Sequence, residues 1–200
     1  MATQKDTANK IFEAALEEFS QHGFAGARID RIAERASVNK AMIYYHFKSK
    51  EKLYETIIGL HLDKIRNFFR ERIVGHDDPE EIFRSLAEFY NNQLQAKSFI
   101  PIFLREMASG GERIKSAFAG FQSDGAPYKI KSLMKNAVEN GLFRDIDLSH
   151  AIASFIGMNM FYLLMSPLVN QLLEIDDEKR FGEKRAEAVV DLFLNGLKTK

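Results

Sequence analysis

Apolar residues return at every third or fourth position along most of the chain, which is the spacing of a helix with one buried face. Ile11, Ala15 and Phe19 form one such series, and Leu53 and Ile57 belong to another. No convincing segment alternates apolar and polar residues as a half-buried strand would. The pattern therefore predicts an all-α fold.

Four helices are predicted in the first third of the chain. The first covers 7–22, because Gly23 followed by Phe24 is typical of a helix end with a left-handed glycine. Two very short helices follow, and helices of this length do not hold alone, so they must pack against their neighbours. The four-residue link between them forces a steep crossing, which is a helix-turn-helix. The two short helices are 29–36 and 40–46, the second with Asn39 as its N-cap. The fourth is a long helix that starts at Lys50 and is capped by Ser49.

The second part of the chain is predicted to form another helical domain. Residues 75–81 read as a linker and a helix start, with Pro79 and acidic residues in the first turn. We expect an N-terminal domain over 5–65 and a larger C-terminal domain over 66–200. Helices are predicted there at about 79–96, 99–108, 111–123, 127–140, 147–165 and 179–197.

Composition narrows the classes of function. The 200 residues are 46% hydrophobic, which is enough to bury a sizeable core. Because cysteine is absent, disulfides, thiolate nucleophiles and cysteine-ligated zinc are excluded. The N-terminus lacks the apolar core of a signal peptide, and the most apolar run, 151–165, is short of the ~20 residues that a spanning helix needs. We expect a cytoplasmic protein without a membrane partner.

Positive charge gathers in one segment, although the chain as a whole is neutral. Residues 28–52 contain seven basic and three acidic side chains, and seven minus three gives a net charge of +4. The rest of the chain must therefore carry −4. A local positive field of this kind favours an anionic partner.

Four consecutive rings, residues 44–47, are followed by lysines at every second position, 48, 50 and 52, in NKAMIYYHFKSKEKL, residues 39–53. Ile43 and Phe47 lie four apart and are expected to face inward, which leaves Tyr44 and Tyr45 on other sides of the helix. Tyrosine hydroxyls can bond phosphate, and the free amide groups of a helix N-terminus favour the same group. The alternative is that the tyrosines are half-buried core residues and the lysines a solvated face. Taken as a set, these residues favour contact with DNA.

Residues 9–58 resemble the DNA-binding domain of the TetR (tetracycline-repressor-like) family of transcriptional regulators. The resemblance rests on IFEAALEEFSQHGFAG and on IDRIAERASVNKAMIYYHFKSKEKLY, which fits the family pattern I-A-x-x-A-G-V-S-x-G-x-[LI]-Y-x-H-F-x-[SN]-K-E-x-L at a dozen positions. There are departures. Ala27 and Arg28 stand where the family often has capping hydroxyls, so we expect the cap to pass to Asp30. Ser37 replaces the usual turn glycine.

The resemblance implies a three-helix, helix-turn-helix DNA-binding domain at the N-terminus and a larger C-terminal helical domain for ligand binding and dimerisation. By the same resemblance, Tyr44 and Lys50 match positions that typically touch phosphate. Lys40, Met42 and Tyr45 match positions that face bases or the groove wall. The residues expected at DNA are Arg28, Asn39, Lys40, Ala41, Met42, Tyr44, Tyr45, His46, Lys48 and Lys50.

A regulator of this family would sense a small molecule and dimerise through its C-terminal half. The expected partners are a double-stranded DNA operator, an apolar or aromatic effector, and a second copy of the chain. For the apolar residues concerned, ordinary intramolecular core is the alternative. Ligand contacts are expected at Phe89, Tyr90, Phe103, Met107, Phe121, Tyr128, Met158, Phe161 and Tyr162, and dimer contacts at Phe155, Val189, Phe193 and Leu197.

An enzyme is the main rival class. The five histidines are scattered, and Gly110-Gly111 lacks the lysine and hydroxyl of a phosphate loop. We therefore expect no enzymatic activity, catalytic residue, metal or cofactor. The predicted function is a ligand-responsive homodimeric repressor that leaves a pseudo-palindromic operator when its effector binds. The alternatives are an activator of the same fold, or a helical small-molecule-binding protein without a DNA-binding role, which would leave 28–52 unexplained.

Overall fold

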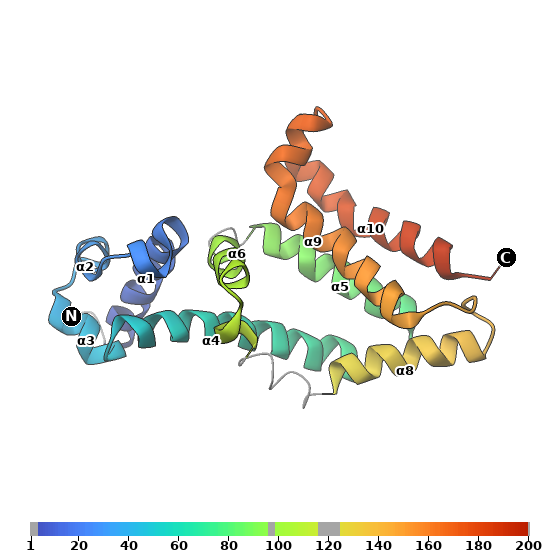
Figure 1. Ribbon diagram of the computed structural model, residues 1–200, viewed down its shortest axis with the longest axis horizontal. Helices are drawn as coiled ribbons and strands as arrows, with labels where there is room; N and C mark the ends of the chain where they lie inside the picture. Colours follow the sequence, from blue (N-terminus) through green and yellow to red (C-terminus); the bar gives the residue numbers. More distant parts are fainter. Residues whose placement is uncertain (1–3, 96–98, 116–124, 200) are drawn as a thin grey trace. The chain divides into compact units, whose positions relative to one another are not determined.

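The computed structural model describes residues 4–95, 99–115 and 125–199, and within these ranges the chain forms helices and no strand (Figure 1). One isolated antiparallel bridge joins Phe143 and Lys198. The all-α prediction is confirmed. The elements are α1 (Gln4–Gly26), α2 (Ile29–Ala36), α3 (Lys40–Phe47), α4 (Lys50–Phe69), the π-helical η1 (Arg70–Val74), α5 (Pro79–Gln95), α6 (Ile100–Ala108), α8 (Ala126–Glu139), α9 (Leu148–Leu172) and α10 (Glu178–Leu197).

The helix break predicted at Gly23 is present, because the backbone there has a positive φ (φ 66, ψ 177), and a further short helical segment continues α1 to Gly26. One predicted helix end was wrong. α9 passes through Pro167 to Leu172 instead of ending near 165. The buried Tyr162 hydroxyl donates to Asn170 Oδ1 at 2.9 Å, and this bond spans the turn that contains the proline. Of the predicted helix 111–123, residues 112–115 are helical, and 116–123 lie outside the described residues.

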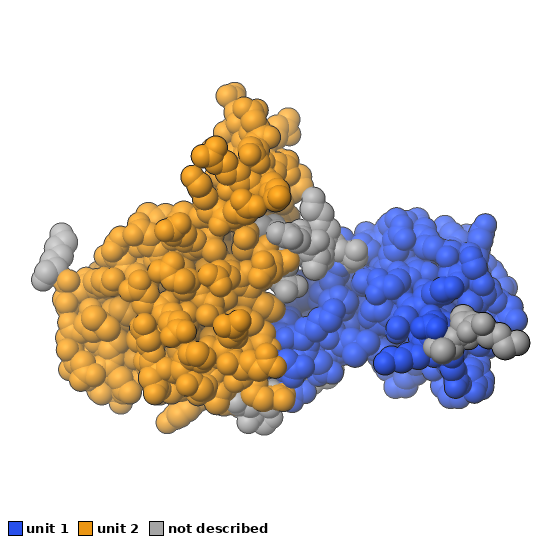
Figure 2. All heavy atoms as spheres, turned by 180° about the vertical axis from the view of Figure 1, so that it is seen from behind, with its two compact units in different colours: residues 1–67, 97–121 blue, residues 68–96, 122–200 orange. Residues whose placement is uncertain are grey.

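Contacts divide the chain into two compact units, which Figure 2 colours separately. Unit 1 consists of 1–67 and 97–121, and unit 2 of 68–96 and 122–200. α6 therefore belongs to the same unit as α1 to α3, although it comes after α5 in the chain. The functional division into 5–65 and 66–200 stays a prediction.

Each unit has its own apolar core. In unit 1, Ile11, Ile43 and Leu53 are fully buried where α1, α3 and α4 meet. In unit 2, α5, α9 and α10 lie side by side (Figure 1), and each contributes one ring to a cluster of Phe83, Phe155 and Phe193. The ring centroids are 4.8–5.0 Å apart with steep interplanar angles, which is the favourable edge-to-face geometry.

Candidate nucleic-acid interface

A tight turn connects α2 to α3 and fixes the helix-turn-helix. Ser37 is left-handed (φ 55, ψ 45). Its N–H donates to the Glu34 carbonyl at 3.0 Å, and the Val38 N–H donates to the Ala33 carbonyl at 2.9 Å. This pair of bonds is the Schellman helix end, which normally places glycine at the left-handed position. Val38 packs against the unit 1 core, so the turn is held from both sides.

The two predicted helix caps are confirmed. Asn39 Oδ1 accepts a hydrogen bond from the Met42 N–H at 2.9 Å at the start of α3. Ser49 Oγ accepts one from the Lys52 N–H at 3.1 Å at the start of α4. Both caps satisfy amide groups that a helix start leaves unpaired.

α3 presents its two tyrosines to solvent. Tyr44 is 47% and Tyr45 is 59% exposed, whereas Ile43, the residue before them, faces the core and is fully buried. The idea that both tyrosines are half-buried core residues was therefore wrong. Met42 and Phe47 are partly buried against the unit 1 core. Met42 consequently has less surface to offer a base than Tyr45 has.

Several of the residues expected at DNA already have contacts within the chain, among them Tyr45, whose hydroxyl accepts a hydrogen bond from Gln4 Nε2 at 2.9 Å. Lys40 forms an ion pair with Asp30 on the surface. The Lys50 ammonium lies 4.8 Å from the centroid of the Phe24 ring. His46 is half-buried, and its Nε2 has no hydrogen-bond partner among the described residues. Exposed ion pairs contribute little free energy, so Lys40 can exchange its carboxylate for a phosphate at small cost.

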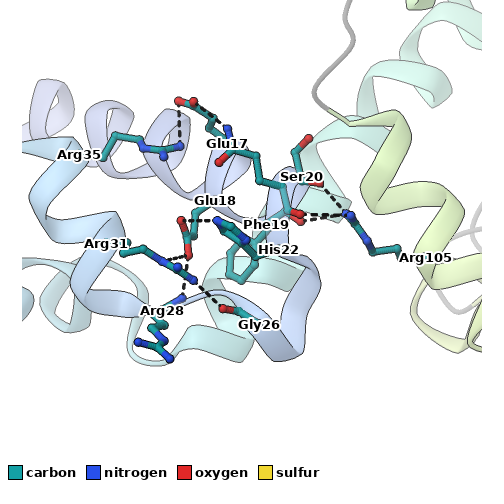
Figure 3. A network of polar contacts seen from close by, with 11 residues as sticks. Glu17, Glu18, Phe19, Ser20, His22, Gly26, Arg28, Arg31, Arg35 and Arg105 are labelled. Atoms are coloured by element: carbon teal, nitrogen blue, oxygen red, sulfur yellow. Dashed lines mark hydrogen bonds and ion pairs between the residues drawn. The ribbon is translucent and has the colours of Figure 1, made fainter. Parts of the chain in front are cut away.

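A buried glutamate from α1 takes the place of the missing cap on α2 (Figure 3). Glu18 Oε1 accepts hydrogen bonds from the Arg28 N–H at 3.0 Å and from Arg31 Nε at 2.7 Å. Arg31 Nη2 also donates to the Gly26 carbonyl at 2.8 Å. The expectation that Asp30 caps α2 was wrong, because the helix has no side-chain cap and Glu18 satisfies the Arg28 amide from outside.

Sequence reasoning missed Glu18, although a signal for it exists. Residue 18 follows Ile11, Ala14 and Ala15 on the buried face of α1, at the spacing seven, four and three. A charged residue at such a position is rarely fully buried unless it is paired. The pattern could have indicated a buried partner, but not which one.

α6 holds the C-terminal part of α1 through Arg105 (Figure 3). The guanidinium donates to the carbonyls of Phe19, Ser20 and Gln21, which precede the interruption at Gly23. Carbonyls near a helix end lack helical partners, and a cation there also complements the helix dipole. Arg105 thus fastens the helix that carries Glu18.

Glu106, the next residue of α6, makes a second set of contacts within unit 1. Glu106 is buried, and its Oε1 accepts hydrogen bonds from the Tyr54 hydroxyl and from Arg113 Nη1, both at 3.0 Å. Burial and the neighbouring carboxylate raise the pKa of Tyr54 well above its ordinary value. The Arg113 guanidinium also lies over the Phe24 and Tyr54 rings, at 5.2 and 5.5 Å. α6 therefore contacts both α1 and α4.

The residues expected at a ligand, nine in all, lie on both units, with Phe103 and Met107 on unit 1 and the other described ones on unit 2, and their role stays a prediction. Phe89 stacks on Phe68 with ring centroids 4.3 Å apart, and Tyr162 is buried against Asn170. Phe121 lies outside the described residues. Two open hollows, one on each unit, are lined mainly by charged and small side chains and include none of the nine. Of the others, Met107, Tyr128, Met158 and Phe161 are exposed, whereas Tyr90 and Phe103 are half-buried.

The four residues expected at a dimer interface belong to the core of a single chain. Phe155, Val189, Phe193 and Leu197 are all buried in unit 2, where two of them take part in the aromatic cluster. Their surface is already used, so the intramolecular alternative describes them better. The apolar periodicity was read correctly, but it cannot distinguish a face that covers the chain's own core from one that covers a partner.

Known proteins are similar to this chain over nearly its whole length. Residues 11–57 match the family model described as bacterial regulatory proteins, tetR family. The chain is 30% identical to the HTH-type transcriptional repressor NicS of Pseudomonas putida, over 98% of this chain and 95% of NicS. It is 29% identical to the HTH-type transcriptional regulator RutR of Escherichia coli K12, over 95% of this chain and 90% of RutR.

Solved structures of the same fold cover nearly all of the chain. The hemolysin II transcriptional regulator HlyIIR aligns with a TM-score of 0.64 and 20% identity, over 99% of this chain and all of HlyIIR. The regulator FadR of Bacillus subtilis, in complex with stearoyl-CoA, aligns with a TM-score of 0.69 and 15% identity, over 94% of this chain and 98% of FadR. At these identities the likeness establishes the fold.

Proposed function

This chain belongs to the tetR family of bacterial regulatory proteins and is a DNA-binding transcriptional regulator, and we propose that it acts in the cytoplasm as a homodimeric repressor released from its operator by a small apolar ligand. The observation that carries the DNA-binding role is the exposed face of α3. Tyr44 and Tyr45 stand there beside Lys40 and Lys48, directly after a turn fixed by backbone hydrogen bonds. Such a helix fits the major groove, with lysines at the phosphate walls.

A homodimer is supported by an apolar stripe on α9 that the described part of the chain leaves exposed. Its five residues follow each other at spacings of three, four, three and four, which is the repeat of helices that pair in bundles. They lie beside, not on, the face that packs into unit 2, and their side chains are 37–75% exposed. We name these residues the α9 stripe: Met158, Phe161, Met165, Leu168 and Leu172.

α10 also carries exposed apolar surface. Leu192 is 65% exposed, although the opposite face of α10 is core. Arg185 donates to the Met158 carbonyl at 3.1 Å, and its buried Nε lacks a hydrogen-bond partner among the described residues. A second copy would cover Leu192.

The α9 stripe also offers an explanation for the length and apolar character of this helix. By length and composition α9 could cross a membrane, and 22% of its most apolar window is buried in the chain. A helix of a soluble protein that covers apolar surface passes the same test. A dimer interface accounts for the uncovered side chains without a membrane.

An apolar effector is supported by the many phenylalanines of the chain and by the acyl ligand of the similar FadR structure. Its binding would shift the population toward a dimer that no longer fits the operator. Repression agrees with the name of NicS, whereas an operator placed to help the polymerase would give activation.

The decisive experiment is selection of binding sites from random duplex DNA with the full-length protein. We expect one sequence with two inverted half-sites about one helical turn apart. Candidate aromatic and acyl compounds are then tested for release of that DNA and for a rise in melting temperature. No enriched sequence would contradict the DNA-binding role, and a single half-site would contradict the dimer.

A further inference from the structure

Glu18 is a fully buried carboxylate at the junction of α1 and α2. Burying a charge is costly unless it is paired and hydrogen-bonded, so such a residue indicates partners that depend on it. Its Oε1 receives both the Arg28 amide and the Arg31 guanidinium. Its Oε2 accepts no hydrogen bond from the described residues, and His22 Nε2 lies 3.7 Å away.

The contact of Glu18 with Arg28 changes what the start of α2 can offer to DNA. Amide groups at a helix N-terminus are ready ligands for phosphate. Here the amide of Arg28, the N-cap residue, is occupied by Glu18, so at this residue the side chain is what remains to reach a phosphate. The Arg28 side chain is exposed and points away from the network in Figure 3, and within the described ranges it makes no recorded hydrogen bond or ion pair.

We propose that the Arg28 guanidinium makes the phosphate contact at the start of α2, and that Glu18 is the positioning residue for this contact. One bond from Glu18 fixes the backbone of Arg28. A second bond from Glu18 holds the Arg31 side chain, and Arg31 also donates a hydrogen bond to the Gly26 carbonyl. The segment 26–31 is thereby ordered before DNA arrives, so binding need not order it.

The role of Arg28 is tested by the salt dependence of operator affinity. For full-length Arg28→Ala on the selected operator, we expect about tenfold weaker binding per protomer. The slope of log affinity against log salt should also fall by about one unit per protomer, because one phosphate contact is lost. An unchanged slope would show that Arg28 touches no phosphate, which would overturn the proposal.

The role of Glu18 is tested by the double variant Glu18→Leu with Arg31→Met. It removes one negative and one positive charge, so the net charge is unchanged, and apolar replacement of a buried ion pair is generally tolerated. We expect the same losses of affinity and slope as for Arg28→Ala. Adding Arg28→Ala to this variant should cost nothing further, because Glu18 acts through Arg28.

Two single variants of Glu18 complete the test. Glu18→Gln retains Oε1 and should restore affinity and slope close to the wild type. Glu18→Asp keeps the charge, but its oxygens fall about 1.5 Å short, so it should show the losses even if the double variant does not fold. Glu17→Gln is the matched control, because Glu17 is a neighbouring acid that pairs with Arg35 on the surface at 3.0 Å; its affinity should not change.

Thermal melts establish that each variant is folded before affinity is compared. If the folded Glu18 variants bind with the wild-type slope while Arg28→Ala does not, Glu18 has only a structural role. Full additivity with Arg28→Ala would lead to the same conclusion. Either result overturns the positioning role and leaves the assignment of the chain as a DNA-binding regulator untouched.

Discussion

Ser37 holds the turn before α3 in a left-handed conformation that costs an L-residue about 1–2 kcal/mol. Glycine avoids this cost but loses more conformational freedom on folding. We expect Ser37→Gly to raise the free energy of unfolding by about 1 kcal/mol, measured by urea titration. Glu174→Gly, at another left-handed residue (φ 51) in unit 2, is the matched control and should have a similar effect. A loss of stability at Ser37 would mean that the serine hydroxyl itself stabilises the turn.

Tyr54 should make the protein sensitive to alkaline pH. Burial first, and the hydrogen bond to Glu106 second, raise its pKa above 10.0. The folded state therefore keeps a proton that the unfolded state loses near pH 10, and the free energy of unfolding falls as the pH rises further, by up to about 1.4 kcal/mol per unit. Relative to wild type, Tyr54→Phe should lose about 1 kcal/mol at neutral pH and show a shallower decline above pH 10. Parallel pH curves for the two proteins would contradict this.

Residue-level contacts were predictable from the sequence only where both partners are close in the chain. The Asn39 and Ser49 side chains accept hydrogen bonds from amide groups three residues ahead. This separation is part of the known N-cap pattern, so it can be predicted from the sequence. Glu18 reaches 10 and 13 residues, and Arg105 reaches 84 to 86 residues. Such contacts depend on how helices pack, which no local pattern specifies.

At the scale of the helices, the α9 stripe gives a prediction about oligomeric state. A carboxylate at Phe161 or Leu168 would be buried without a partner in a dimer, so Phe161→Glu and Leu168→Glu should dissociate it. Light scattering should give the mass of two chains for the wild type and of one chain for the variants. Ile156→Glu is the control, since Ile156 is exposed on a different face of the same helix. A wild-type monomer, or a dimer indifferent to both changes, would refute this interface.

Helix positions were more predictable than the faces they present. α2 begins and ends at the predicted residues, because its apolar period and the turn beyond it are both local. α9 shows the limit. Its sequence is apolar on several sides, and this pattern together with the family resemblance placed Phe155 at a partner, whereas it packs against Phe83. Only the packed structure separates that core face from the exposed α9 stripe.

At the scale of the whole chain, the fold class followed from periodicity, but the division into units did not. A chain read in order suggests two consecutive domains. In the structure, α5 belongs to unit 2, but α6, which follows it in the chain, belongs to unit 1 and contacts its other helices through Arg105 and Glu106. α6 also places Ile102 and Phe103 in the apolar core of unit 1, but an apolar position does not reveal which core it joins, and the polar links through Arg105 and Glu106 leave no periodic signal.

Dimerisation and DNA binding should be coupled in a way that salt titration can measure. A dimer sets two α3 helices on one operator, and each copy releases its own counterions from phosphate. The monomeric Phe161→Glu variant should therefore bind the full operator more weakly, with a salt slope of about half the wild-type value. Ile156→Glu should keep the full slope, because its charge lies away from the α9 stripe. If the monomeric variant kept the full slope, one copy would make all the phosphate contacts, and the operator would be read without a two-fold dimer.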